Sequence, residues 1–266
     1  MRSYIVSAIF RRNSVFFRPY GAMWRQALET FDTLFVQNVE SKRLLSEIGF
    51  DNVVVAGDTR FDRVAQIAAA AQRVETIERF RGGGRLFVAG STWGPDEEIL
   101  LPLVNANPDV KFVIAPHEMD EGRIAHLMRD AKGGAVRYTQ CDAATRFDDV
   151  QVLVLDTMGM LSSVYGSATW AYVGGGFGVG IHNTLEAATF GLPIAFGPNY
   201  GKFKEARDMV SLGCAVSVRT AGELAAWFAP LRDDEETLRR ASRTAKDYTA
   251  RNQGATGIIL RSIFNS

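Results

Sequence analysis

The chain has little of what marks several broad classes of protein. Its 266 residues include only two cysteines, Cys141 and Cys214, and three histidines. Two distant cysteines cannot form the disulfide framework of a small secreted domain, which favours a reducing compartment. No apolar run approaches the roughly 18 residues needed to cross a bilayer, and residues 1–12 lack the long apolar region of a signal peptide. These absences predict a soluble protein on the cytoplasmic side of the membrane.

An excess of charge of one sign is also missing. Thirty lysine and arginine residues balance thirty aspartate and glutamate residues, so no net field attracts a polyanion and we expect no nucleic-acid partner. The sequence also lacks the residue spacing of a metal site. His117 and Glu118 match the first two positions of the HExxH zinc-binding motif, but Glu121 occupies the position of its second histidine. We therefore predict no metal and no cofactor.

Short β-branched runs alternate with longer amphipathic stretches along the chain. This rhythm predicts right-handed βαβ units, and the continuous apolar runs suit a parallel sheet covered on both faces. The expected strands are 4–8, 33–37, 53–55, 86–89, 111–115, 152–155, 170–173, 193–196 and 215–218. The expected helices are 20–29, 39–48, 95–105, 120–129, 160–165, 182–190, 203–212 and 221–228, followed by a helical tail over 233–264. The fold class is thus α/β, doubly wound.

The strands are unevenly distributed between two parts of the chain. Residues 1–57 hold too few strands to bury a sheet and begin directly on one, so they are interpreted as the remnant of a first Rossmann-like domain. Residues 58–266 read as one complete doubly wound domain that includes the C-terminal helix.

Ligands of open parallel sheets bind beyond the carboxyl ends of the strands, so the residues after each strand are the candidates. Gly90 and Ser91 follow the first strand of the second domain, where Ser91 or Thr92 is expected to cap the next helix. Exposed amides there could hold a phosphate, although a plain capped turn explains the same residues. Residues 116–117 and 156–161 follow the next strands, and Met158 and Met160 could equally belong to the core.

The densest signal is the run Gly174-Gly175-Gly176-Phe177-Gly178-Val179-Gly180. So many glycines after a strand indicate positive φ angles or the close approach of a ligand. His182 and Asn183 then open a helix in which Asn183 can act as the cap. Glu186 lies one turn further on the same face, where a carboxylate can accept from two hydroxyls of a ribose.

The common phosphate and nucleophile motifs do not fit these turns. The glycine run lacks G-x-G-x-x-G spacing and has no acidic residue about 20 positions later. Residues 197–203 approach a Walker A loop but are one residue short and carry Phe203 where a magnesium ligand is required. No G-x-S-x-G elbow is present. Dehydrogenase, NTPase and α/β-hydrolase functions are therefore disfavoured.

Taken together, four ordered motifs resemble the donor-binding half of the 3-deoxy-D-manno-octulosonic acid (Kdo) transferases, which are GT-B glycosyltransferases. The longest is GGGFGVGIHNTLEAATFGLPIAFGPNYGKFKEA, at 174–206. The others are AGDTRFD at 56–62, IAPHE at 114–118 and LDTMG at 155–159. The resemblance implies transfer of Kdo from CMP-Kdo to a lipid A precursor, lipid IVA, in lipopolysaccharide core synthesis at the cytoplasmic face of the bacterial inner membrane.

The resemblance also implies a set of donor contacts. CMP is expected on Pro116, His117, Met158, Gly159, Met160, Asn183, Thr184, Leu185 and Glu186. Ser91, Gly175, Gly176 and His182 are further expected donor contacts. Many relatives have arginine at the position of His117 and glutamate at the position of Met160, so donor binding here should depend more on backbone amides.

By the same resemblance, the general base is a glutamate in the N-terminal half, together with the membrane-anchoring segment. Neither is found in this sequence, because Glu29, Glu40 and Glu47 lie on predicted helices with the spacing of a solvated face. We expect a truncated chain with no catalytic residue of its own, which binds the donor but is inactive alone. Membrane association would then depend mainly on the missing half.

Two alternatives remain open at this stage. One is another GT-B glycosyltransferase, or a sugar-nucleotide epimerase, that uses a UDP- or GDP-sugar. Such proteins usually carry a second acidic residue further along the helix, whereas residues 187–191 contain none. The other is a non-catalytic nucleotide-binding module.

Overall fold

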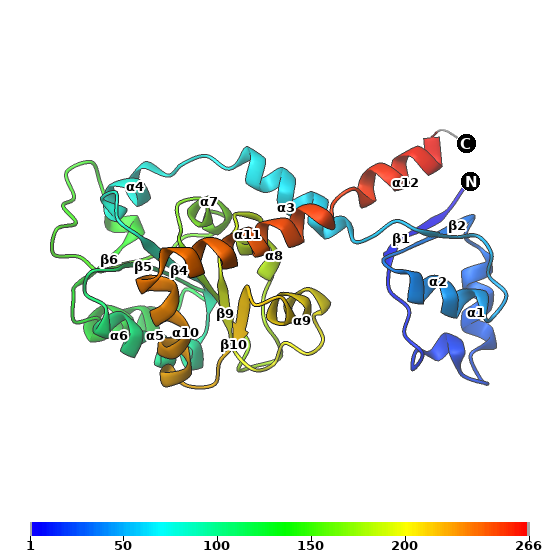
Figure 1. The fold of residues 1–266 in the computed structure, drawn as a ribbon, viewed down its shortest axis with the longest axis horizontal. Coiled ribbons are helices and arrows are strands. Elements are labelled where there is room, and N and C mark those ends of the chain that lie inside the picture. Colours follow the sequence, from blue (N-terminus) through cyan, green and yellow to red (C-terminus); the bar gives the residue numbers. More distant parts are fainter. Residues whose placement is uncertain (1, 265–266) are drawn as a thin grey trace. The chain divides into compact units, whose positions relative to one another are not determined.

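The structure is a computed structural model that describes residues 2–264. It divides into two compact units: unit 1 comprises residues up to Gln66 together with those from Ala250 onward, and unit 2 comprises Ile67–Thr249. The helices α3 (Thr59–Ala70) and α11 (Glu235–Arg251) each run from one unit into the other. Figure 1 shows the elements of both units.

Unit 2 is built on a seven-stranded parallel sheet in the order β10-β9-β8-β4-β5-β7-β6. Its strands are β4 (Leu86–Thr92), β5 (Lys111–Pro116), β6 (Ala135–Arg137), β7 (Val152–Val154), β8 (Trp170–Val173), β9 (Ile194–Phe196) and β10 (Ala215–Ser217). The chain builds outward from β4 through β5, then returns to the other side of β4 with β8. This reversal creates a topological switch point between β4 and β8, where open α/β sheets bind their ligands.

Helices cover both faces of this sheet (Figure 1). One face packs against α4 (Glu75–Arg81), α7 (Leu161–Tyr165), α8 (Thr184–Thr189) and α9 (Lys204–Ser211). The other packs against α5 (Gly94–Ala106), α6 (Glu121–Asp130) and α10 (Ala221–Asp233).

The central strands supply alternate residues to the two cores. Val88 and Val113 point to the first core, while their neighbours Phe87 and Phe112 point to the second. Because successive side chains of a strand face opposite ways, a continuous apolar run fills both layers. The α/β, doubly wound fold class expected from the sequence is confirmed.

Unit 1 holds a three-stranded parallel sheet in the order β1-β2-β3. Its elements are β1 (Tyr4–Ala8), the 3₁₀ turn η1 (Val15–Phe17), α1 (Ala22–Glu29), β2 (Thr33–Val36), α2 (Val39–Ser46), β3 (Val53–Val55) and the C-terminal α12 (Ala255–Phe264). Ile259 of α12 packs with Phe35 and Ala56, so the two ends of the chain share one small core. Asp62 fixes the start of α12 by accepting from the amides of Gly254 and Thr256.

The compact units divide the chain differently from the expected boundary after residue 57. The first nine residues of the expected second domain, 58–66, lie in unit 1, because Thr59 donates its amide to Ser7 Oγ and Asp62 holds α12. The outermost positions of the two expected domains, residues 1 and 265–266, lie outside the described residues.

The helical tail is also interrupted. Gly254, at φ +108°, separates α11 from α12. Within residues 2–264, no helix combines the length and apolar character that a membrane crossing requires.

Candidate donor-binding site

The candidate site lies at the carboxyl edge of the unit 2 sheet, at the switch point. A cavity of about 480 Å³ opens there. Its walls come from the turns after β4, β5 and β8, which are neighbours in the sheet although they are distant in sequence. The lining residues are Trp93, Pro95, Asp96, His117, Gly175, Phe177, Gly178, Val179, Gly180 and His182.

Three stacked rings form one wall of this cavity. The rings of Trp93 and His117 lie 4.6 Å apart between centroids, and those of His117 and His182 lie 4.4 Å apart. Both pairs are close to parallel, with interplanar angles of 29° and 27°. The stack therefore joins one residue from each of the three turns and fixes their relative positions.

The stack also determines the protonation state of His182. Nε1 of Trp93 donates to Nε2 of His182 over 3.3 Å. An indole N–H can only donate, so Nε2 of His182 must be the unprotonated nitrogen of a neutral ring. Burial lowers the pKa of His182, and repulsion by His117 lowers it further, while Asp96 acts in the opposite direction. The ring consequently stays neutral to a lower pH than an ordinary histidine.

A fully buried carboxylate, that of Asp96, ties the glycine loop to the first turn of α5. Its Oδ1 accepts from the Tyr172 hydroxyl at 2.7 Å. Its Oδ2 accepts from the amides of Gly175 at 3.0 Å and Trp93 at 2.9 Å. Burial raises the pKa of Tyr172, and the nearby Asp96 carboxylate raises it further, so the phenol remains a donor.

This network corrects the expected helix cap. Trp93, and neither Ser91 nor Thr92, occupies the N-cap position of α5. The Asp96 carboxylate, three residues further along the chain, accepts a hydrogen bond from the backbone amide of Trp93. The hydroxyl of Thr92 instead donates to the buried carboxylate of Glu97, which also pairs with Arg123 at 2.6 Å.

A second polar group lies at the start of α8. Oδ1 of Asn183 accepts from the amide of Leu185 at 3.1 Å and so caps the helix, as expected from the sequence. The Asn183 amide group donates to Glu186 at 3.0 Å, and the Ser162 hydroxyl of α7 donates to the same carboxylate at 2.8 Å. Each Glu186 oxygen therefore has one donor and still has lone pairs for further hydroxyl donors.

The other expected contacts are distributed around this edge. Thr184 and Leu185 are buried beneath the cap, and Pro116 is buried at the end of β5. The Thr184 hydroxyl is buried without a hydrogen-bond partner among the described residues. Met158 is 83% exposed, Gly159 has φ +81°, and Met160 packs partly against the core. Met158 is thus a surface residue, whereas Met160 has a structural contact.

Glycine is required in the loop by close backbone contacts. A Cβ on Gly176 would lie 2.6 Å from the Gly197 backbone, and one on Gly174 would lie 2.2 Å from the Ser91 carbonyl oxygen. Gly175 has φ +89° and faces the His182 ring. Ser91 itself has φ +53°, a left-handed conformation that costs a non-glycine residue about 1–3 kcal/mol. The strained turn and the glycine loop are therefore packed directly on each other.

Sequence reasoning did not single out Trp93, Asp96 or the side chain of Phe177 as members of the site. Trp93 and Asp96 were treated only as part of a capped turn. The only sequence feature that could have identified them is their position, an aromatic and an acidic residue shortly after the first strand of the domain. Their roles depend on His182, 89 residues from Trp93 in the chain, and on Gly175, 79 residues from Asp96.

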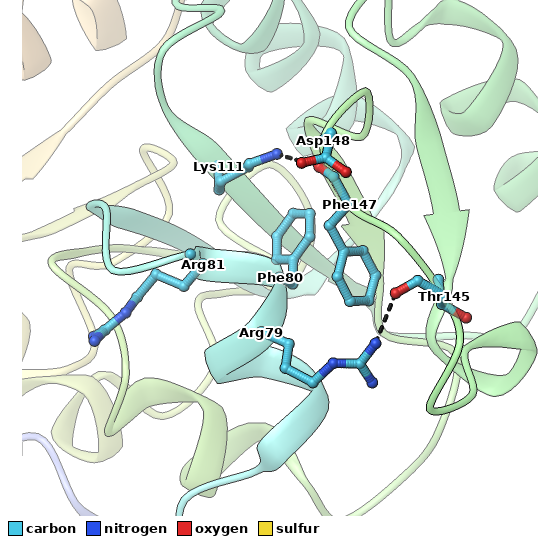
Figure 2. A pocket seen from close by; sticks show the side chains of 8 residues that line it. Arg79, Phe80, Arg81, Lys111, Thr145, Phe147 and Asp148 are labelled. Carbon is cyan, nitrogen blue, oxygen red and sulfur yellow. Dashed lines mark hydrogen bonds between the residues drawn. The ribbon is translucent and has the colours of Figure 1, made fainter.

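A second cavity, of about 540 Å³, lies at the opposite edge of the sheet near the start of β5 (Figure 2). Phe80 and Phe147 meet edge to face within it. Arg79 donates to the carbonyls of Asp142 and Thr145, and Lys111 donates to the carbonyls of Phe147 and Val150. These cations hold a surface loop, so this cavity is the weaker candidate for an anionic ligand.

Comparisons with known proteins find relatives of this chain among glycosyltransferases. No protein-family model matches the chain. A 3-deoxy-D-manno-octulosonic acid transferase of Bordetella pertussis is 26% identical over 97% of this chain and 62% of its own length. The chain is similar to the Kdo transferases. This confirms the resemblance inferred from the four sequence motifs.

Other Kdo transferases match over a smaller part of their length. The enzyme of Rickettsia bellii is 23% identical over 85% of this chain and 55% of its own length. The chain therefore spans roughly half to two thirds of these curated relatives.

Solved structures confirm the GT-B type of fold. The C-terminal CMP-Kdo binding domain of WaaA from Acinetobacter baumannii superposes with a TM-score of 0.52 at 20% identity, over 69% of this chain and 96% of that domain. A UDP-N-acetylglucosamine 2-epimerase superposes with a TM-score of 0.64 at 12% identity, over 99% of this chain and 66% of that one. At these identities, both comparisons establish the fold and leave the ligand open.

Proposed function

We propose that this chain binds the CMP-Kdo donor of a Kdo transferase, at the carboxyl edge of the unit 2 sheet. The observation that carries the proposal is the hydrogen-bonded group of Asn183, Glu186 and Ser162 at the start of α8. It follows directly in the chain on His182, which lines the switch-point cavity. Sequence similarity to Kdo transferases supports the assignment to this glycosyltransferase class.

The site contains groups suited to each part of such a donor. The Glu186 carboxylate, oriented by Ser162 and Asn183, would accept the two ribose hydroxyls. The backbone beside Pro116, His117 and residues 158–160 would contact the base. The Kdo end would face the glycine loop, near Gly175, Gly176 and His182, with Ser91 beside it. No metal or cofactor is part of this proposal.

The proposed acceptor is a lipid A precursor, lipid IVA, at the cytoplasmic face of a bacterial inner membrane. Transfer to it also needs a general base, and the candidate glutamates of unit 1 are poorly placed for that role. Glu40 and Glu47 are exposed on α2 or at its end, and both pair with Arg43, while Glu29 is exposed on α1. We propose that the chain alone supplies donor binding and that catalysis needs a base from outside these residues.

Calorimetric titration of the purified chain with CMP, UMP and GMP tests the proposed donor. We expect saturable binding of CMP with a stoichiometry of one and clearly weaker binding of UMP and GMP at the same concentrations. The physical reason is that the cytosine edge is read at one position of the site while the ribose and phosphate contacts are shared by all three nucleotides.

Two results would overturn this proposal. Tighter binding of UMP or GMP would assign the chain to a glycosyltransferase or epimerase that uses another sugar nucleotide. Absence of binding by all three, with the chain shown to be folded by its circular dichroism spectrum, would mean that the described residues do not make a nucleotide site.

A further inference from the structure

The loop of residues 197–203, which joins β9 to α9 (Figure 1), borders a hollow that the proposed nucleotide contacts do not use. The hollow has a volume of about 420 Å³. Its lining residues are Gly178, Val179, Pro198, Asn199, Gly201 and Lys202. Gly178 and Val179 also line the switch-point cavity, so the hollow and that cavity meet at the tip of the glycine loop.

The two loops that form the hollow hold each other in place. The backbone amide of Asn199 donates to the Gly176 carbonyl at 2.8 Å, and its side-chain amide donates to the Gly178 carbonyl at 2.7 Å. A Cβ on Gly197 would lie 2.7 Å from the Gly176 carbonyl carbon, so the two backbones are in direct contact there. The shape of the hollow is therefore fixed by the fold.

The hollow offers hydrogen-bond donors and positive charge. The backbone amides of Val179, Gly201 and Lys202 have no protein acceptor within residues 2–264. The Lys202 side chain is exposed, and no carboxylate of the described residues lies within ion-pair distance of it, whereas Lys204 pairs with Asp208. None of the residues that line the hollow is acidic. N–H groups and an ammonium without a competing carboxylate suit an anion.

The surroundings of the hollow indicate which anion. It adjoins the glycine loop, where the sugar end of the proposed donor lies. The sugar of CMP-Kdo carries a carboxylate on the same carbon that is joined to the CMP phosphate, so this group lies close to the phosphate in any bound pose. Among the residues that line the hollow and the switch-point cavity, Lys202 is the one with a permanent positive charge.

We propose that Lys202, together with the amides of Val179 and Gly201, binds the carboxylate of the donor's sugar. This inference rests on the proposed function, because it requires a CMP-sugar at the same edge of the sheet. It adds a specificity to that function: the site selects a nucleotide-activated sugar acid over a neutral sugar. A phosphate group of the acceptor has similar chemistry, and the experiment below distinguishes these two sources.

Calorimetry with freshly prepared CMP-Kdo and with CMP tests the proposal. Near neutral pH both ligands carry about two negative charges, so the ratio of their affinities reports where the charge lies. Lys202→Met should lower the affinity for CMP-Kdo relative to CMP about tenfold, because it removes a charge-assisted hydrogen bond. Lys202→Arg keeps the charge and should retain most of the parent's ratio. The difference between parent and Lys202→Met should shrink at high salt, since ions screen an exposed pair.

Lys204→Met is the matched control, because it removes the same charge from an exposed lysine two residues away. It should keep the parent's ratio. The subsite is overturned if Lys202→Met also keeps that ratio, as it would if Lys202 held a phosphate of the acceptor, or if Lys204→Met lowers the ratio equally. Failure of the parent to bind either ligand would overturn the proposed function and the subsite with it, so CMP binding by the parent separates the two failures.

Discussion

Replacing Asp96 by alanine is expected to lower the free energy of unfolding of unit 2 by about 3–5 kcal/mol. The buried carboxylate accepts three hydrogen bonds, from the Tyr172 hydroxyl and from the amides of Trp93 and Gly175. Hydrogen bonds to a charged group contribute more than neutral ones, and the abandoned amides would stay buried without partners. Asp96 is fully buried, so water cannot replace the carboxylate without rearrangement.

The measurement is urea unfolding followed by tryptophan fluorescence in a Trp24→Phe background. The remaining tryptophans, Trp93, Trp170 and Trp227, then all lie in unit 2 and report its unfolding. Asp96→Asn should cost less than the alanine variant, because its amide oxygen can still accept both backbone N–H groups. Asp109→Ala, on an exposed aspartate, should have little effect. An Asp96→Ala variant within about 1 kcal/mol of the parent would refute the role given to this network.

Replacing Glu186 by alanine is expected to weaken CMP binding by about 100-fold or more. Two charge-assisted hydrogen bonds to ribose hydroxyls are worth about 1.5–3 kcal/mol each, and 1.4 kcal/mol corresponds to a tenfold change in the dissociation constant. Glu186 is only partly buried, and its partners Ser162 and Asn183 can turn to solvent. The variant should therefore lose affinity while keeping most of its stability.

Calorimetry of the variant with CMP measures this effect. Glu98→Ala removes an exposed glutamate from α5 and serves as the control with equal change in charge. Thermal unfolding of both variants separates a loss of contact from a loss of fold. If Glu186→Ala keeps the CMP affinity of the parent, the carboxylate does not contact the ribose as proposed. If Glu98→Ala weakens CMP binding equally, the loss of affinity comes from the change in net charge and not from a contact of Glu186.

The fold could be predicted from sequence wherever a local pattern determines it. Continuous apolar runs such as Trp170–Val173 identified the central strands, because strands buried on both faces leave no polar position. The edge strand β6, Ala135–Arg137, was missed because its three half-buried residues form no apolar run. The helix α3 was missed because only Phe61 and Val64 of its twelve residues are buried.

The candidate site shows the same division between local and tertiary information. The Asn183 cap and its contact with Glu186 follow from spacing along one helix, so the sequence predicted that they share a face. The ring stack of Trp93, His117 and His182 joins three separate strand ends. No local sequence pattern predicts this contact between distant residues, because it depends on the order of the strands in the sheet.

The location of the nucleotide is the central claim, and a backbone amide NMR titration of the chain with CMP tests it most directly. The claim predicts shift changes at Gly159, Asn183 and Leu185 at the carboxyl edge of the sheet, with the amides of Arg81 and Lys111 beside the second cavity unaffected. Shift changes confined to Arg81, Lys111 and their neighbours, with the residues around Asn183 unperturbed, would contradict it.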